Sequence, residues 1–119
     1  MSVADALATL RTKAAQCDSL VASAHRLDDA GAPLFSPIDR QQIAVAAFLN
    51  LFVAWEEFLE TSMTNFMSGE STLSGAQPTK YVSPPNPAAA RALVVGVNRY
   101  FDYANHEFVR RMVLMYFRD

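Results

Sequence analysis

The sequence predicts an all-α fold: an up-down helical bundle with a long central helix and one long loop rich in Pro, Gly and Ser. Apolar residues recur at steps of three and four through residues 43–67, which is the periodicity of a helix. Gly and Pro are absent from residues 1–30, where Ala is frequent, and this favours helix there. At this length we expect a single domain, residues 1–119.

The first predicted helix carries apolar residues in a heptad-like seam. It is expected to end near Asp29, because Gly31 and Pro33 follow. A seam of this kind suggests a helical partner, and we expect a homodimer. The seam residues are Val3, Leu7, Leu10, Ala14, Cys17, Val21 and Ala24.

Ser36 is expected to cap the central helix, with Pro37 as its first residue, and the helix should reach about Met67, where Gly69 ends it. Its apolar stripe covers more than half of the circumference, so it should be surrounded on several sides. Trp55, in the middle of this stripe, should be largely buried. The stripe consists of Val45, Phe48, Leu49, Phe52, Trp55, Leu59, Met63 and Phe66.

Residues 69–86 form the long predicted loop, because their prolines rule out a helix interior. Asn86-Pro87 then predicts the start of a third helix that reaches about Val97. Asn105 is a good N-cap for a last helix. That helix runs up to Asp119 without a closing Gly or Pro, which leaves open whether residues 1–119 are the whole domain or the N-terminal part of a longer one.

The composition is unusually apolar for a small domain. Hydrophobic residues make up 51% of the chain and charged residues 18%, against a usual charged share of about 25%. Two explanations remain open. Either the chain oligomerises through an apolar face, or further helices of a longer protein cover that face.

The net charge of −2 gives no global attraction to nucleic acid, although residues 80–119 carry 6 basic and 3 acidic side chains. A single cysteine, Cys17, excludes an internal disulfide and fits a reducing, cytoplasmic setting. The uncharged run between Arg40 and Glu56 is shorter than the roughly 18 residues of a membrane span, so no membrane association is expected.

The sequence shows no phosphate-binding glycine loop and no His or Cys cluster with metal spacing, so we expect no cofactor and no metal. Glu56 and Glu60 share a helix face. A carboxylate metal site in a bundle would also need Glu-x-x-His motifs, and none is present. We interpret the two glutamates as solvent-exposed residues on a polar face or at the rim of the bundle.

Arg99 and His106 are the candidate catalytic residues. A guanidinium can hold a phosphate with two hydrogen bonds, and an imidazole can move protons near neutral pH. The pair would suffice for cleavage of RNA by its own 2′-hydroxyl without a metal. In the alternative interpretation Arg99 pairs with Asp102 or Glu107, and His106 is an ordinary first-turn residue.

Three segments resemble a bacterial branch of the HEPN superfamily of small, often homodimeric, all-α domains. They are residues 54–59 (AWEEFL), residues 78–85 with Pro84-Pro85, and residues 99–105 (RYFDYAN). The resemblance covers most of residues 40–119. It implies metal-independent ribonuclease activity or RNA binding, in a toxin–antitoxin or defence context with a cognate antitoxin as partner.

The motif of that family is an Arg, four to six residues, and a His, and the six residues between Arg99 and His106 match this spacing. Tyr100 departs from the polar residue expected after the Arg. In this branch the motif usually lies in a further helix, beyond Asp119. Three hypotheses therefore remain: an active endoribonuclease, an inactive RNA-binding relative, and a non-enzymatic helical dimerisation or protein-interaction module.

Overall fold

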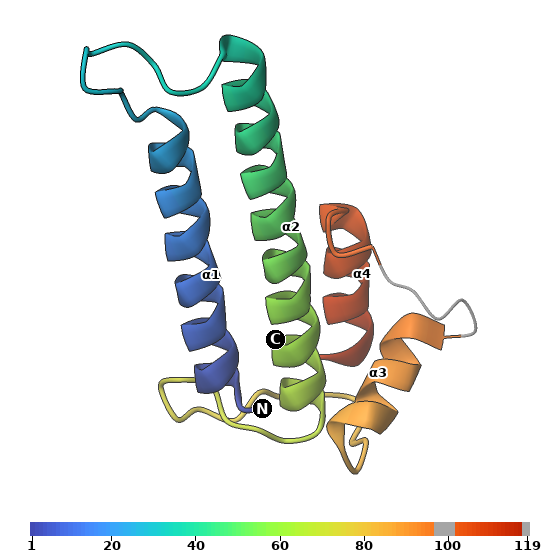
Figure 1. Ribbon diagram of the computed structural model, residues 1–119. Coiled ribbons are helices and arrows are strands. Elements are labelled where there is room, and N and C mark those ends of the chain that lie inside the picture. The colour runs from blue at the N-terminus through green and yellow to red at the C-terminus, as the bar shows by residue number, and fades with distance from the viewer. Residues whose placement is uncertain (97–101, 118–119) are drawn as a thin grey trace. The chain divides into compact units, whose positions relative to one another are not determined.

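The computed structural model describes residues 1–96 and 102–117. These residues form four helices, α1 (Val3–Ala24), α2 (Pro37–Met67), α3 (Pro87–Val95) and α4 (His106–Tyr116), and no strand (Figure 1). The all-α prediction with a long central helix is confirmed.

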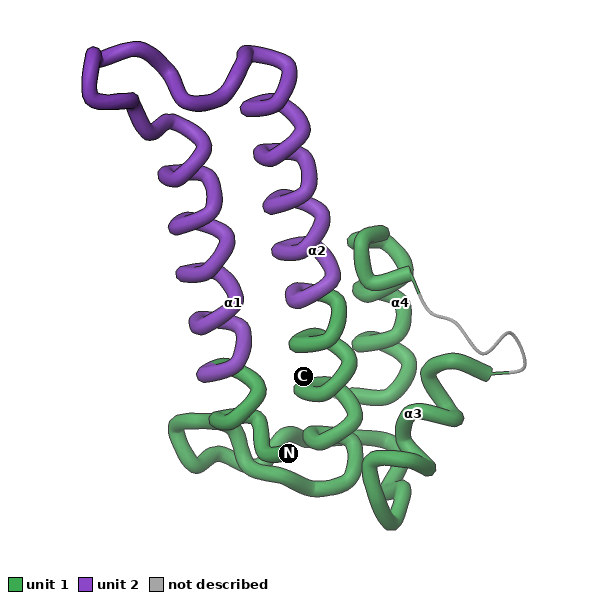
Figure 2. The backbone as a smooth tube through the Cα atoms, viewed as in Figure 1, with its two compact units in different colours: residues 1–7, 56–119 green, residues 8–55 purple. Residues whose placement is uncertain are grey.

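Two compact units make up the structure (Figure 2). Unit 1 contains residues 1–7 and 56–119, and unit 2 contains residues 8–55. Because α1 and α2 are continuous, each contributes residues to both units. The prediction of a single domain stays a prediction.

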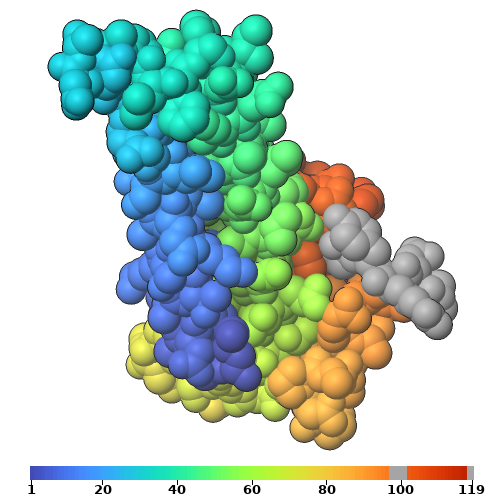
Figure 3. Space-filling view, in the orientation of Figure 1, coloured from blue at the N-terminus to red at the C-terminus, as the bar shows by residue number. Residues whose placement is uncertain are grey.

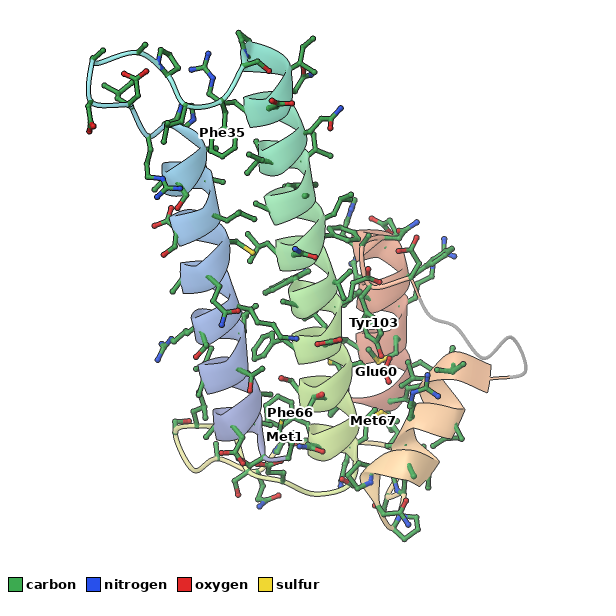
Figure 4. The ribbon with its side chains drawn as sticks, in the orientation of Figure 1. Met1, Phe35, Glu60, Phe66, Met67 and Tyr103 are labelled. Atoms are coloured by element: carbon green, nitrogen blue, oxygen red, sulfur yellow. The ribbon has the colours of Figure 1, made fainter. Side chains whose placement is uncertain are left out.

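Unit 2 is a hairpin of two helices, in which α1 and α2 run antiparallel and their atoms lie in contact (Figure 3). The side chain of Phe35, from the connection, lies between the ends of the two helices (Figure 4). Only small residues of α2 are fully covered here, since Ala47 and Ala54 are 2% and 3% exposed. A two-helix unit therefore buries just one side of each helix.

The predicted end of α1 near Asp29 is wrong, because the helix ends at Ala24. The residues that follow form a tight loop with an isolated bridge between Leu27 and Pro33. The carboxylate of Asp28 accepts hydrogen bonds from the amides of Ala30 and Ala32, each at 2.9 Å. An Asp side chain that satisfies nearby amides in this way competes with helical hydrogen bonding.

Both predicted limits of α2 are confirmed. At its start the hydroxyl of Ser36 accepts a hydrogen bond from the amide of Asp39 at 3.1 Å. This gives a partner to one of the first N–H groups of the helix, which have no acceptor within the helix itself. At its end Gly69 has φ +107°, a left-handed conformation that favours glycine. The ammonium of Lys80 then donates to the carbonyl of Met67, the last residue of α2.

Unit 1 has the larger core. Met67 is fully buried, and it packs with Ala90 and Val94 of α3 and with Met112 of α4. The long loop is tied to α4, because the amide of Tyr81 donates to the carbonyl of Tyr116 at 2.8 Å. The N-terminal residues also belong to this unit, where the amide of Val3 donates to the carboxylate of Glu70 at 2.9 Å.

The expectation that α2 is surrounded on several sides fails in unit 2. Trp55 is 44% exposed, so the prediction that it is largely buried is wrong. The physical reason is that α1 covers one side of α2 and no other described residue of unit 2 covers the rest. Seven large apolar residues of α2 are exposed there: Ile38, Val45, Phe48, Leu49, Leu51, Val53 and Trp55.

Among the described residues, α2 is the helix that is long and apolar enough to cross a membrane by those two criteria. Its most apolar 18-residue window has a mean hydropathy of 1.4, and 11% of this window is buried. Core helices of soluble proteins meet the same criteria. The expectation of no membrane association stays a prediction.

Candidate interaction surface

The two predicted catalytic residues cannot be compared as a pair, since Arg99 lies outside the described residues. His106 is the first residue of α4. Asn105 caps the helix at this point, because its side-chain oxygen accepts hydrogen bonds from the amides of Glu107 and Phe108 at 3.0 and 3.3 Å. The predicted cap of the last helix is thus confirmed.

The imidazole of His106 is open to solvent, with 89% of the side chain exposed. Its Nε2 lies 3.2 Å from a carboxylate oxygen of Glu107. Glu107 also lies 3.9 Å from the guanidinium of Arg110, one turn further along α4. This part of α4 is an exposed, mixed-charge helix start, which agrees with the interpretation of His106 as an ordinary first-turn residue.

Of the two glutamates predicted to share a face of α2, Glu60 has a partner on another helix. Glu60 forms an ion pair with Arg91 of α3 at the edge of the unit 1 core, with 31% of the Glu60 side chain exposed. Within residues 1–96 and 102–117, no group of three His, Cys, Asp or Glu side chains is placed to hold a metal ion. The carboxylate of Glu60 therefore serves a structural ion pair.

Beside this ion pair lies Tyr103, which is 4% exposed and belongs to the core of unit 1 (Figure 4). Burial is the main cause that raises the pKa of its phenol, because the charged form loses hydration. The negative charge of Glu60 raises the pKa further, and the positive charge of Arg91 lowers it. Tyr103 is consequently neutral across the physiological range.

A groove open to a ligand lies between α1 and α2 in unit 2, with a volume of about 580 Å³. We call it the alanine groove. Most of its lining is apolar and one residue, Asp18, is charged. The lining residues are Ala14, Ala15, Cys17, Asp18, Val21, Ala44, Ala47, Phe48 and Leu51. An open apolar groove next to exposed large side chains is a common property of protein-binding surfaces.

Two smaller grooves differ from it in character. One, of about 300 Å³, lies elsewhere on the same hairpin and includes the polar residues Lys13, Gln16 and Asn50. The other, of about 180 Å³, lies between α3 and α4 in unit 1 and is lined by Phe108, Met115 and Arg111, among others. The alanine groove is thus both the largest of the three and predominantly apolar.

Sequence reasoning identified the apolar surplus and left open whether a second copy or further helices cover it, but it expected the stripe of α2 to be surrounded within the chain. The signal that locates it is the uncharged run of residues 41–55, which coincides with the part of α2 that has only one helical neighbour in its unit. Arg91 and Lys80, which anchor α2 in unit 1, gave no sequence signal, because isolated cations at distant positions show no periodicity.

Comparisons with protein-family models, with curated proteins and with solved structures find no match to this chain. The HEPN resemblance therefore depends on the quoted residues alone.

Proposed function

We propose that the chain is a non-enzymatic helical interaction module, and that its working surface is the exposed apolar side of the α1–α2 hairpin. One observation carries the proposal. Phe48 and Trp55 are 63% and 44% exposed on a helix with no charge between residues 41 and 55. Exposed apolar surface of this kind favours association, because its removal from water releases roughly 25 cal/mol per Å².

The setting of the proposal is cytoplasmic, where a lone thiol such as Cys17 stays reduced. The partner is a protein rather than a small molecule, because the exposed side chains continue along α2 beyond the groove itself. Protein interfaces have an apolar centre with a polar rim, and the charged residues Arg40 and Glu56 bound the apolar run at its two ends.

A photo-reactive phenylalanine analogue at position 48 tests this proposal in living cells. We expect one discrete cross-linked product of higher mass, identified by mass spectrometry. The matched control is the same analogue at Leu73, which is 62% exposed but lies in the long loop of unit 1. Equal or absent cross-linking at the two positions would remove the proposal.

A second candidate function is metal-independent RNA cleavage by Arg99 and His106, in a defence or toxin–antitoxin system. The observation in its favour is the 89% exposed imidazole, which any substrate could reach. The test is cleavage of a labelled single-stranded RNA in EDTA by the wild type and by His106→Ala. We expect a 2′,3′-cyclic phosphate product from the wild type alone if the pair is catalytic. Equal results for both chains would exclude it.

A further inference from the structure

We infer that the alanine groove is covered by a second copy of this chain, so that two α1–α2 hairpins pair about a two-fold axis into a four-helix bundle. The inference depends on the proposed function and names the partner of that same surface. It goes beyond the dimer expected from the heptad seam, because residues of α2 line the groove together with the seam residues Ala14, Cys17 and Val21.

The surface contains both a projection and a depression. Phe48 projects with 63% of its surface exposed, and its ring lies 6.3 Å from that of Phe52. The alanines of the groove leave room beside it for large side chains from another helix. A two-fold interface needs this combination in one surface, because each copy must offer what the other receives. A second copy therefore fits without any further partner.

The position of the exposed residues along α2 supports a helical occupant. Ala44, Phe48, Leu51 and Trp55 are separated by steps of four, three and four, which places them on one stripe. This is the spacing with which helices interlock in coiled coils and four-helix bundles. Phe48 and Trp55 are both exposed on this stripe, although apolar residues at this spacing are normally covered by a neighbouring helix.

Charge also favours a second copy. Residues 41–55 carry no charge, so two copies of α2 meet no like-charge repulsion there. On α1, Arg11 and Asp18 are exposed and seven residues apart, on one stripe with Ala14. In an antiparallel pairing centred between them, Arg11 of each copy lies opposite Asp18 of the other. The small side chains Ala14 and Ala15 then lie at the crossing point.

The size of the surface is adequate. At 1.5 Å per residue, residues 37–55 are about 28 Å long, and two helices side by side are about 20 Å wide. The flat projection of this surface is about 560 Å², and its solvent-accessible area is larger because the side chains project from it. It is therefore comparable with the roughly 800 Å² that each partner contributes to a standard interface.

A lipid bilayer is the less suitable occupant. The uncharged run of residues 41–55 extends about 22 Å as a helix, short of the roughly 30 Å of a hydrocarbon core. The other helix of the hairpin bears Arg11, Lys13 and Asp18, so it cannot accompany α2 into lipid without a large cost.

Sedimentation equilibrium of the full chain, from about 0.1 to 100 μM, tests the inference. We expect a monomer–dimer equilibrium in which Phe48→Glu raises the dissociation constant by about 100-fold, since each two-fold dimer contains the change twice. The matched control is Leu49→Glu, which alters a 55% exposed residue outside the groove lining. It should change the dissociation constant of the dimer less than about threefold.

A charge exchange on α1 tests the orientation. Asp18→Arg places two arginines opposite each other in both symmetric positions and should weaken the dimer about tenfold. The double variant Arg11→Asp with Asp18→Arg should restore the wild-type constant, because the pairs are re-formed with their signs reversed. Restoration of this kind is specific to self-pairing and does not depend on the stability of the monomer.

The outcomes separate the inference from the proposed function. A monomer at 100 μM whose position 48 cross-links to a different protein would overturn the inference and leave the interaction module standing. A monomer with no cross-link would overturn both. A monomer that sediments with vesicles of phosphatidylcholine and phosphatidylglycerol would show that lipid covers the face. A dimer weakened by Leu49→Glu but not by Phe48→Glu would place the interface elsewhere and overturn the inference.

Discussion

The ammonium nitrogen of Lys80 lies 2.7 Å from the carbonyl oxygen of Met67, and thus a cation from the long loop caps the C-terminus of α2. The last carbonyls of a helix lack intrahelical donors and carry the negative end of its dipole. Met67 is itself fully buried, so this carbonyl has restricted access to water. Lys80 thereby connects the end of the longest helix to a loop thirteen residues further on.

Replacing Lys80 with Met removes this cap while preserving most of the side-chain length. We expect a loss of about 1–2 kcal/mol in the free energy of unfolding, since a charged hydrogen bond and a favourable dipole interaction both disappear. Urea denaturation followed by far-UV circular dichroism measures the change. The control is Arg110→Met, whose 70% exposed cation lies 3.9 Å from its partner, and a loss of equal size there would contradict the capping role.

The N-cap of α4 should contribute measurably to stability. Asn105→Ala leaves the amides of Glu107 and Phe108 without their side-chain acceptor, and we expect a loss of about 1 kcal/mol. Asn86→Ala should cost a similar amount at α3, where the same type of cap accepts the amide of Ala89 at 2.8 Å. Thermal unfolding compares these variants with Asn50→Ala in the interior of α2, which should not destabilise the monomer.

Core and surface residues of α2 should differ sharply. Met67→Ala creates a cavity in the unit 1 core and should cost about 2–5 kcal/mol. Trp55→Ala, at a 44% exposed position, should cost the monomer less than half of that. The measurement is urea unfolding at a protein concentration low enough to keep the chain monomeric. Equal losses would mean that Trp55 is covered in the monomer after all.

Tyr103 predicts a dependence of stability on alkaline pH. Its pKa is raised in the folded chain by burial and by Glu60, above the value of about 10 for an exposed tyrosine. The neutral phenol therefore contributes stability that is fully present below about pH 10. This stability is lost as the pH rises from there toward the folded pKa, by about 1.4 kcal/mol per pH unit.

Unfolding free energies measured between pH 8 and 11 for the wild type and for Tyr103→Phe isolate this effect from the other tyrosines. The difference between the two chains should be constant up to about pH 10 and then change in favour of the phenylalanine variant. A constant difference through pH 11 would show that the phenol is accessible to hydroxide in the folded chain.

Local chemistry explains which parts of the fold could be predicted from the sequence. The starts of α2, α3 and α4 were correctly predicted because Ser36, Asn86 and Asn105 each bond to amides within three residues. The end of α1 was missed because Asp28 closes a loop that competes with one more turn of helix. Caps and turns of this kind depend on residues that are neighbours along the chain, so a sequence pattern can predict each of them. Whether the Asp28 loop or a further turn of α1 forms depends on their relative free energies, which the pattern does not give.

Burial was harder to predict than helicity. Periodicity correctly gave the stripe that contains Phe48 and Trp55, but it does not say which element covers the stripe, and in unit 2 those residues remain exposed. The candidate site shows the same limit. The cap at Asn105 placed His106 in the first turn of α4 as expected, while its geometry toward Arg99 falls outside the described residues.

The tie between Tyr81 and Tyr116 has a consequence for the rate at which backbone protons exchange with solvent. The side chain of Tyr81 is 66% exposed, yet its amide donates to the carbonyl of the last residue of α4. Exchange at this amide requires the loop to separate from α4, whose Met112 lies in the core of unit 1. Deuterium should therefore enter Tyr81 as slowly as it enters the helices, and enter Leu73 and Ser74 of the same loop much sooner.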